Sequence, residues 1–166
     1  MNVWIVNLKD NRKEKTNENN RSKFEICKEK SVIAFGWAVD KSAKTWDEYK
    51  YNVSHYSDFS KNDIRSFLKA ATAFENMKPD DLVWTRDPNT KKYYICKILS
   101  DFEPSVFRNL EGCDISVFRN CEYKEIGFLP TVTNKITWRN LISRPTVRRV
   151  LNNTVITETN RLFKEV

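Results

Sequence analysis

The sequence predicts a mixed α+β domain in which helices flank a highly curved sheet or small barrel. Apolar strand-like runs alternate with helical patterns in the first half of the chain, and several strand-like runs follow one another afterwards. That order favours a mixed sheet with helices at its side. The 166 residues match one ordinary domain, and no Ser/Gly/Pro linker or change of composition divides them. We therefore expect a single domain over residues 1–166.

The N-terminal quarter predicts two buried strands joined by a loop and a short helix. Val3–Leu8 is apolar at every position but Asn7, which is typical of a central strand buried on both faces. The polar residues from Lys9 to Arg21 predict a loop. Lys23–Glu29 fits a short helix, and Val32–Phe35 a second buried strand that ends at Gly36.

Two helices are expected next. Thr45, followed by two acidic residues, indicates the start of a short one. Ser60 with Asp63 three residues later is a variant capping box, which predicts a helix N-terminus. The helix that follows buries a stripe at helical spacing, made up of Ile64, Phe67, Leu68, Ala71 and Phe74. Met77 extends the pattern and Pro79 ends it.

The rest of the chain predicts more strands and a last helix. Leu82–Arg86 and Tyr93–Leu99 flank the turn residues 87–90, so they are expected to form a hairpin. Two further strands are expected at Ile115–Tyr123 and Glu125–Leu129. The last segment is expected to be helical, because the spacing of its apolar residues fits a helix. These residues are Val147, Val150, Leu151 and Leu162.

The charge balance favours an anionic partner. The chain has 29 Lys and Arg against 22 Asp and Glu, a net charge of +7. The excess is uneven, because residues 132–166 hold seven basic and two acidic residues. Five of the seven are Arg, whose guanidinium fork suits phosphate. A solvated basic face with no partner is the alternative interpretation.

Residues for catalysis, metals and cofactors are scarce, so we expect no enzyme and no cofactor. None of the four cysteines forms a C-x-x-C pair, and His55 is the one histidine, so no zinc-ligand pattern exists. The three glycines are not clustered, which excludes a phosphate-binding loop. His55 would have to be the base of any hydrolase triad, yet no nucleophile elbow is present.

The sequence also predicts a cytoplasmic location. The apolar start is too short for a signal peptide, and no run approaches membrane-spanning length. We therefore expect no membrane partner and reduced thiols.

One enzymatic alternative stays open, a metal-dependent nuclease. Such a site pairs carboxylates on a metal with a lysine near the attacking water. Asp80, followed at a distance by Glu122 and Lys124, loosely fits that description. Asp80 and Asp81 are better explained as turn residues that enter a strand.

Aromatic and basic residues interleave in a way that is typical of nucleic-acid binding. Trp84 and Arg86 share a strand face, and Lys91 lies at the tip of the same hairpin. Trp37 directly follows a buried strand, where a pocket can open, and Trp46 lies a little further along. Aromatic rings stack on bases and guanidinium groups contact phosphates. Burial in the core is the alternative for each tryptophan.

Four segments together resemble the PUA-like superfamily, in particular its EVE and YTH branches. They are the opening strand Val3–Asn7, the run Ile33–Trp37, the helix-to-strand step Phe74–Trp84 and the strand Tyr93–Ile98. The resemblance covers about residues 1–100. It implies a curved six-stranded sheet or barrel with a pocket for one modified or flipped base. YTH domains bind methylated adenine in RNA, and EVE-like domains read DNA in modification-dependent restriction systems of the McrBC kind.

The resemblance and the interleaving together define a candidate site. The residues expected to hold the base are Trp37, Trp84, Trp46, Asn7 and Asp40. Those expected to hold the nucleic-acid backbone are Lys9, Arg12, Arg86, Lys91, Arg139 and Arg148. The expected partner is DNA or RNA, and the chain would be fused to or associated with an effector nuclease or NTPase. A protein-interaction domain with an incidental basic face is the further alternative.

Overall fold

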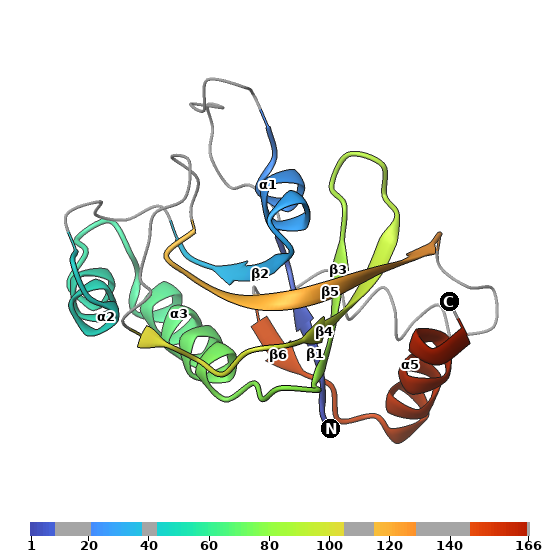
Figure 1. Cartoon of the computed structure of the whole chain (residues 1–166). Coiled ribbons are helices and arrows are strands. Elements are labelled where there is room, and N and C mark those ends of the chain that lie inside the picture. Colours follow the sequence, from blue (N-terminus) through green and yellow to red (C-terminus); the bar gives the residue numbers. More distant parts are fainter. Residues whose placement is uncertain (9–20, 38–42, 105–114, 129–146, 166) are drawn as a thin grey trace.

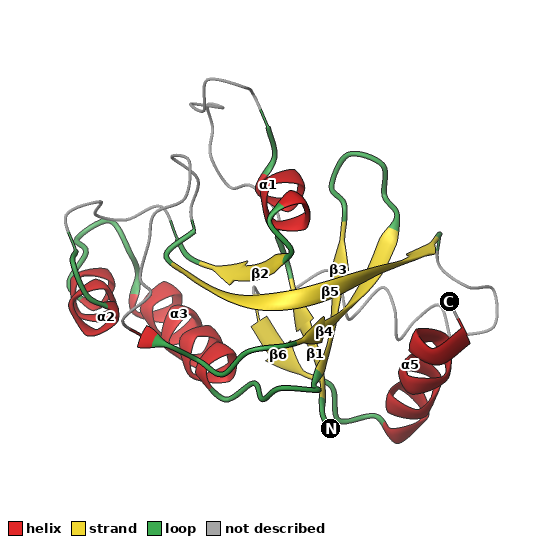
Figure 2. Ribbon diagram, in the orientation of Figure 1, coloured by secondary structure: helices red, strands yellow, loops and turns green. Residues whose placement is uncertain are grey.

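A computed structural model describes residues 1–8, 21–37, 43–104, 115–128 and 147–165. In these ranges the chain forms one six-stranded mixed sheet that curls into a half-barrel, with four helices around it (Figures 1 and 2). The strand order across the sheet is β2-β5-β4-β3-β1-β6. This confirms an α+β fold with a curved mixed sheet.

The helices and strands have the following bounds. The strands are β1 (Val3–Val6), β2 (Val32–Phe35), β3 (Leu82–Arg86), β4 (Tyr93–Ile98), β5 (Val117–Gly127) and β6 (Val147–Arg149). The helices are α1 (Lys23–Glu29), α2 (Trp46–Ser54), α3 (Lys61–Glu75) and α5 (Asn153–Glu165). None of the helices in the described ranges has the length and apolar character that a membrane crossing requires.

Local signals located most of these elements. The bounds of α1, β2 and β3 agree with the sequence prediction, and β1 and β4 are shorter than predicted at their C-terminal ends. Thr45 and Ser60 are the N-caps of α2 and α3, and each side chain accepts a backbone N–H three residues on. The predicted buried stripe of α3 is wrong at Leu68, which is exposed, because Ala70 packs against the core instead.

Two predictions in the second half of the chain are wrong. Residues 117–127 form one long strand rather than two, because β4 pairs with β5 from Ile98 opposite Cys121 to Tyr93 opposite Gly127. A bulge at Tyr93 and Tyr94 accommodates the irregular register. The final segment is not helical throughout. Residues 147–149 form β6, which pairs with β1, and the helix begins after it.

The sheet separates two hydrophobic cores. Successive side chains of β1 point to opposite faces, so Trp4 and Val6 enter the larger core while Val3 and Ile5 enter the smaller one. The larger core also contains side chains of the first three helices, among them Phe24, Trp46, Tyr49, Phe67 and Phe74. The smaller core contains Trp84 and Ile95 of the sheet and Val155 of α5.

A buried carboxylate joins the N-terminal ends of the parallel strands β1 and β3. Asp81, 1% exposed, directly precedes β3, which runs parallel to β1. One of its oxygens accepts the backbone N–H of Asn2 at 2.6 Å. The other accepts the indole Nε1–H of Trp4 at 2.7 Å and the backbone N–H of Lys78 at 3.1 Å. The start of β1 and the turn before β3 therefore share one acceptor group.

A buried guanidinium group holds α3 against the sheet. Arg119 lies on β5, and its Nε and Nη2 donate to the carbonyl of Phe74 at 3.2 and 3.0 Å. Nη2 also donates to the Glu75 carbonyl at 2.8 Å, and Nη1 to that of Ser100 at 3.1 Å. Phe74 and Glu75 are the last two residues of α3, where carbonyls lose the regular i+4 donor of the helix, so Arg119 adds donors that cap this end. Burial lowers the pKa of Arg119 to about 10, and it remains cationic at neutral pH.

Two neighbouring aspartates give a matched test of the Asp81 network. In Asp81→Asn an amide NH₂ would face donors that now point at a carboxylate, so we expect the free energy of unfolding to fall by roughly 2–4 kcal/mol. Asp80→Asn makes the same chemical change one residue earlier, at an exposed side chain paired with Lys97. We expect it to have little effect. Urea unfolding of both variants is the measurement, and equal midpoints would contradict the network.

Candidate nucleic-acid interface

Trp37 is the candidate whose surroundings suit a ligand best. It follows β2 directly and is partly buried, whereas Trp4, Trp46 and Trp84 are at most 5% exposed. The hydroxyl of Tyr49 on α2 accepts the Trp37 backbone N–H at 2.7 Å and donates to its carbonyl at 2.6 Å. Both backbone groups of Trp37 are thereby held by one side chain, which fixes the position from which the indole ring projects.

Two phenylalanines contact the ring of Trp37. Phe59 and Phe67 each have a ring centroid 5.4 Å from that of Trp37, at interplanar angles of 87° and 70°. Tyr56, which is 38% exposed, packs against Phe59 with centroids 5.0 Å apart. Phe67 is buried in α3, but Trp37, Tyr56 and Phe59 all retain exposed surface. We call these three residues the aromatic cluster.

A buried lysine lies beside the aromatic cluster. Lys23 is 2% exposed, and its ammonium donates to the carbonyl of Gly36 at 3.2 Å. Its backbone is placed by the first turn of α1, where Ser22 and Glu25 form a reciprocal capping box. The Lys23 side chain therefore contacts the peptide group that precedes Trp37. Lys23, Tyr56 and Phe59 are not among the residues that the sequence pattern predicts for the site. The capping box was visible in the sequence, but the burial of Lys23 was not.

The structure corrects the expectation that Trp84 and Trp46 face a ligand. Trp84 lies in the smaller core, across the sheet from Trp37, and its Nε1–H donates to the Thr159 hydroxyl of α5 at 2.8 Å. Trp46 lies in the larger core and donates to Glu75 at 2.5 Å. Both rings are 2% exposed, so neither offers a face to a base. Trp37 and Trp84 cannot stack on the same base in this arrangement.

Asn7 is separated from Trp37 by the direction of the strands. β1 runs parallel to β3, and three antiparallel pairings lead from β3 to β2, so β1 and β2 run in opposite directions. Asn7 follows β1 and Trp37 follows β2, so they leave the sheet at opposite ends. The structure therefore does not bring them together.

The described basic candidates are dispersed. Arg86 donates to the Lys91 carbonyl at 3.3 Å and lies 5.4 Å from the Tyr93 ring. Lys91 adopts a positive φ of 66° in the hairpin turn and donates to the Pro88 carbonyl. Arg148 lies on edge strand β6 opposite Ile5, and burial lowers its pKa. The remaining candidates, Lys9, Arg12, Asp40 and Arg139, lie outside the described residues.

Two of the residues considered for a nuclease, Asp80 and Lys124, are engaged in other contacts. Asp80 has a φ of 71° and pairs with Lys97 at 2.8 Å, which lowers the pKa of its carboxyl group. The ammonium of Lys124 donates to the Phe163 carbonyl of α5 at 2.7 Å. Within the described ranges, no group of three or more His, Cys, Asp and Glu side chains is placed to hold a metal ion.

Comparison of the chain with protein-family models, with curated proteins and with solved structures finds no match.

A double-mutant cycle tests whether Trp84 is structural. Trp84→Phe keeps most of the apolar volume but removes the Nε1–H donor, and Thr159→Val removes its acceptor. We expect each single change to lower the free energy of unfolding by about 1–2 kcal/mol. The double variant should lose less than the sum, because the two groups share one hydrogen bond.

Urea unfolding gives the stability of all four proteins. Oligonucleotide affinity measured on the same samples should not change. A loss of affinity in Trp84→Phe at unchanged stability would instead place the ring at the ligand.

Proposed function

We propose that this chain is a nucleic-acid-binding module in which the aromatic cluster takes one base of a bound strand. The observation that carries the proposal is the partial exposure of Trp37 beside Tyr56 and Phe59, in a structure that buries the other described tryptophans. A large aromatic ring left at the surface and held in position by its backbone is suited to stacking. Stacking of a base on an aromatic side chain contributes roughly 1–3 kcal/mol.

The charge of the chain supports the same function. A net charge of +7 raises the local concentration of polyanions and speeds their association. The side chain of Lys23 contributes a further basic group, bound to the carbonyl of Gly36 directly before Trp37. The polar edge of a base, or a neighbouring phosphate, is stabilised by such a basic group. A methylated base would gain further, because its methyl group adds apolar area against the rings.

We also propose that the domain is PUA-like, of the EVE or YTH kind. The curved six-stranded mixed sheet and the order of its first elements support this assignment. Under it Trp37, after the second strand, would be the principal aromatic residue of a modified-base pocket. Trp84 and Asn7 would have no part in holding the base, in contrast to the expectation from sequence.

Substitution at Trp37 tests the proposed site. We expect the unaltered protein to prefer one base, modified or not, by at least about tenfold in a panel of labelled DNA and RNA oligonucleotides, which is about 1.4 kcal/mol. Trp37→Ala should abolish that preference while salt-sensitive background binding persists, and Trp37→Phe should retain part of it. Fluorescence anisotropy at two salt concentrations measures both quantities.

Phe128→Ala is the matched control. Phe128 is a 68% exposed aromatic residue just after β5, whose other end pairs with the end of β2 that carries Trp37. Its removal should leave binding unchanged. If Trp37→Ala and Phe128→Ala both retain full affinity and preference, the aromatic cluster is not the binding site. If the unaltered protein binds no oligonucleotide at low salt, the proposed function is wrong.

A further inference from the structure

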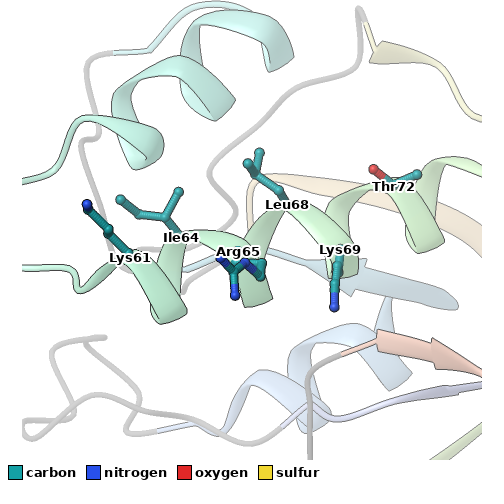
Figure 3. A pocket seen from close by; sticks show the side chains of 6 residues that line it. All are labelled: Lys61, Ile64, Arg65, Leu68, Lys69 and Thr72. Atoms are coloured by element: carbon teal, nitrogen blue, oxygen red, sulfur yellow. The ribbon is translucent and has the colours of Figure 1, made fainter.

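The outer face of α3 carries a stripe of positive charge. Lys61, Arg65 and Lys69 recur every four residues and are all exposed (Figure 3). Four residues advance a helix by about 6 Å and slightly more than one turn, so the three positions follow one another along the helix. In Figure 3 the side chains of Arg65 and Lys69 point the same way, and that of Lys61, in the first turn, points away from them. Together with Ile64, Leu68 and Thr72 they line an open hollow of about 490 Å³. We call Lys61, Arg65 and Lys69 the α3 stripe.

The acidic residues of α3 do not neutralise this charge. The carboxylate of Asp63 accepts the backbone N–H and the hydroxyl of Ser60, at 3.0 and 2.6 Å. The carboxylate of Glu75 accepts from Trp46 and forms an ion pair with Lys50 at 2.9 Å. No ion pair within the described part of the chain involves a member of the α3 stripe.

The α3 stripe brings no evident benefit to the fold. Like charges four residues apart destabilise a helix. The first turn of a helix is stabilised by acidic side chains and not by lysines. Helix α3 is already secured by its capping box, by Arg119 at its C-terminal end and by Phe67 and Phe74 in the core. A bound polyanion would remove the repulsion between these charges. Binding therefore explains the α3 stripe, whereas the stability of the fold does not.

Apolar side chains next to the α3 stripe narrow the choice of polyanion. Leu68 is 40% exposed and Ile64 is partly exposed, and both line the same hollow as the basic residues. A single-stranded nucleic acid offers phosphates at regular intervals together with unpaired bases and sugars that can contact such side chains. A duplex hides its base faces, so it offers less contact to these apolar side chains.

We propose that the α3 stripe binds the phosphate backbone of single-stranded nucleic acid. This inference rests on the proposed nucleic-acid binding but not on Trp37, which packs on the buried side of the same helix through Phe67. The α3 stripe would supply affinity for any sequence, and the aromatic cluster would supply preference for a base.

The triple variant Lys61→Gln, Arg65→Gln, Lys69→Gln tests the α3 stripe. The affinity constant K falls with salt, so the slope of log K against log salt is negative. Loss of three phosphate contacts should make this slope less steep by about 2 for single strands. At low salt the affinity should fall at least about tenfold, equally for all sequences, because the lost contacts carry no base information. Anisotropy titrations of single-stranded oligonucleotides at several salt concentrations provide both values, and thermal melting checks the fold.

A second triple variant, Lys30→Gln, Lys44→Gln, Lys164→Gln, removes the same charge from exposed positions on other elements. We expect a much smaller fall in affinity and in slope. If the two triple variants lose affinity equally, only the net charge matters and the α3 stripe is not a binding surface. The proposed function would then survive through Trp37.

Three further outcomes would overturn the inference. The first is a loss confined to duplex DNA in the α3-stripe variant. The second is stripe-dependent binding to vesicles of phosphatidylserine without binding to oligonucleotides. The third is failure of the unaltered protein to bind any oligonucleotide, which would overturn the proposed function as well.

Discussion

The carboxylate of Asp81 accepts hydrogen bonds from Asn2, directly before β1, from Trp4 of β1, and from Lys78 in the turn that precedes β3. Burying a charge is costly, and several N–H donors aimed at the same group offset that cost. Asp81 therefore holds β1 and β3 in parallel register, with Val3 opposite Leu82. β6 pairs on one side of these two strands, and β4, β5 and β2 follow on the other, so both parts of the sheet are joined through this pair.

The register of β1 and β3 also decides which tryptophan rings are buried in the two cores. In β1, Trp4 enters the larger core with its indole N–H on Asp81. In β3, Trp84 points to the opposite face, where the hydroxyl of Thr159 satisfies its indole N–H. A shift of one residue in either strand would exchange these faces. Trp37 lies beyond the last residue of β2, where the alternation of side chains between the two faces of the strand no longer places its ring in a core, and the ring stays partly exposed.

Helix α3 connects the fold to the proposed function. Its inner side carries Phe67, which packs on Trp37, and Phe74, whose carbonyl accepts from Arg119. Its outer side carries the α3 stripe. Arg119 and the capping box at Ser60 secure both ends of the helix without using its exposed side chains, so these side chains can serve the proposed binding. The same division is visible in Asp63 and Glu75, which serve local contacts and leave the stripe positively charged.

The sequence by itself determined the features that depend on near neighbours in the chain. Ser60 with Asp63 located the start of α3, and the apolar run at 32–35 located β2, because capping and continuous burial leave a local pattern. Only the tertiary structure decided the rest. Val147 lies in a strand because β1 offers it a partner, and residues 117–127 form one strand because β4 pairs along them. The candidate site changed for the same reason. No local pattern distinguishes Trp84 and Trp46 from Trp37. Strand register and helix packing, which involve distant segments of the chain, decide whether each ring is buried in a core or stays partly exposed.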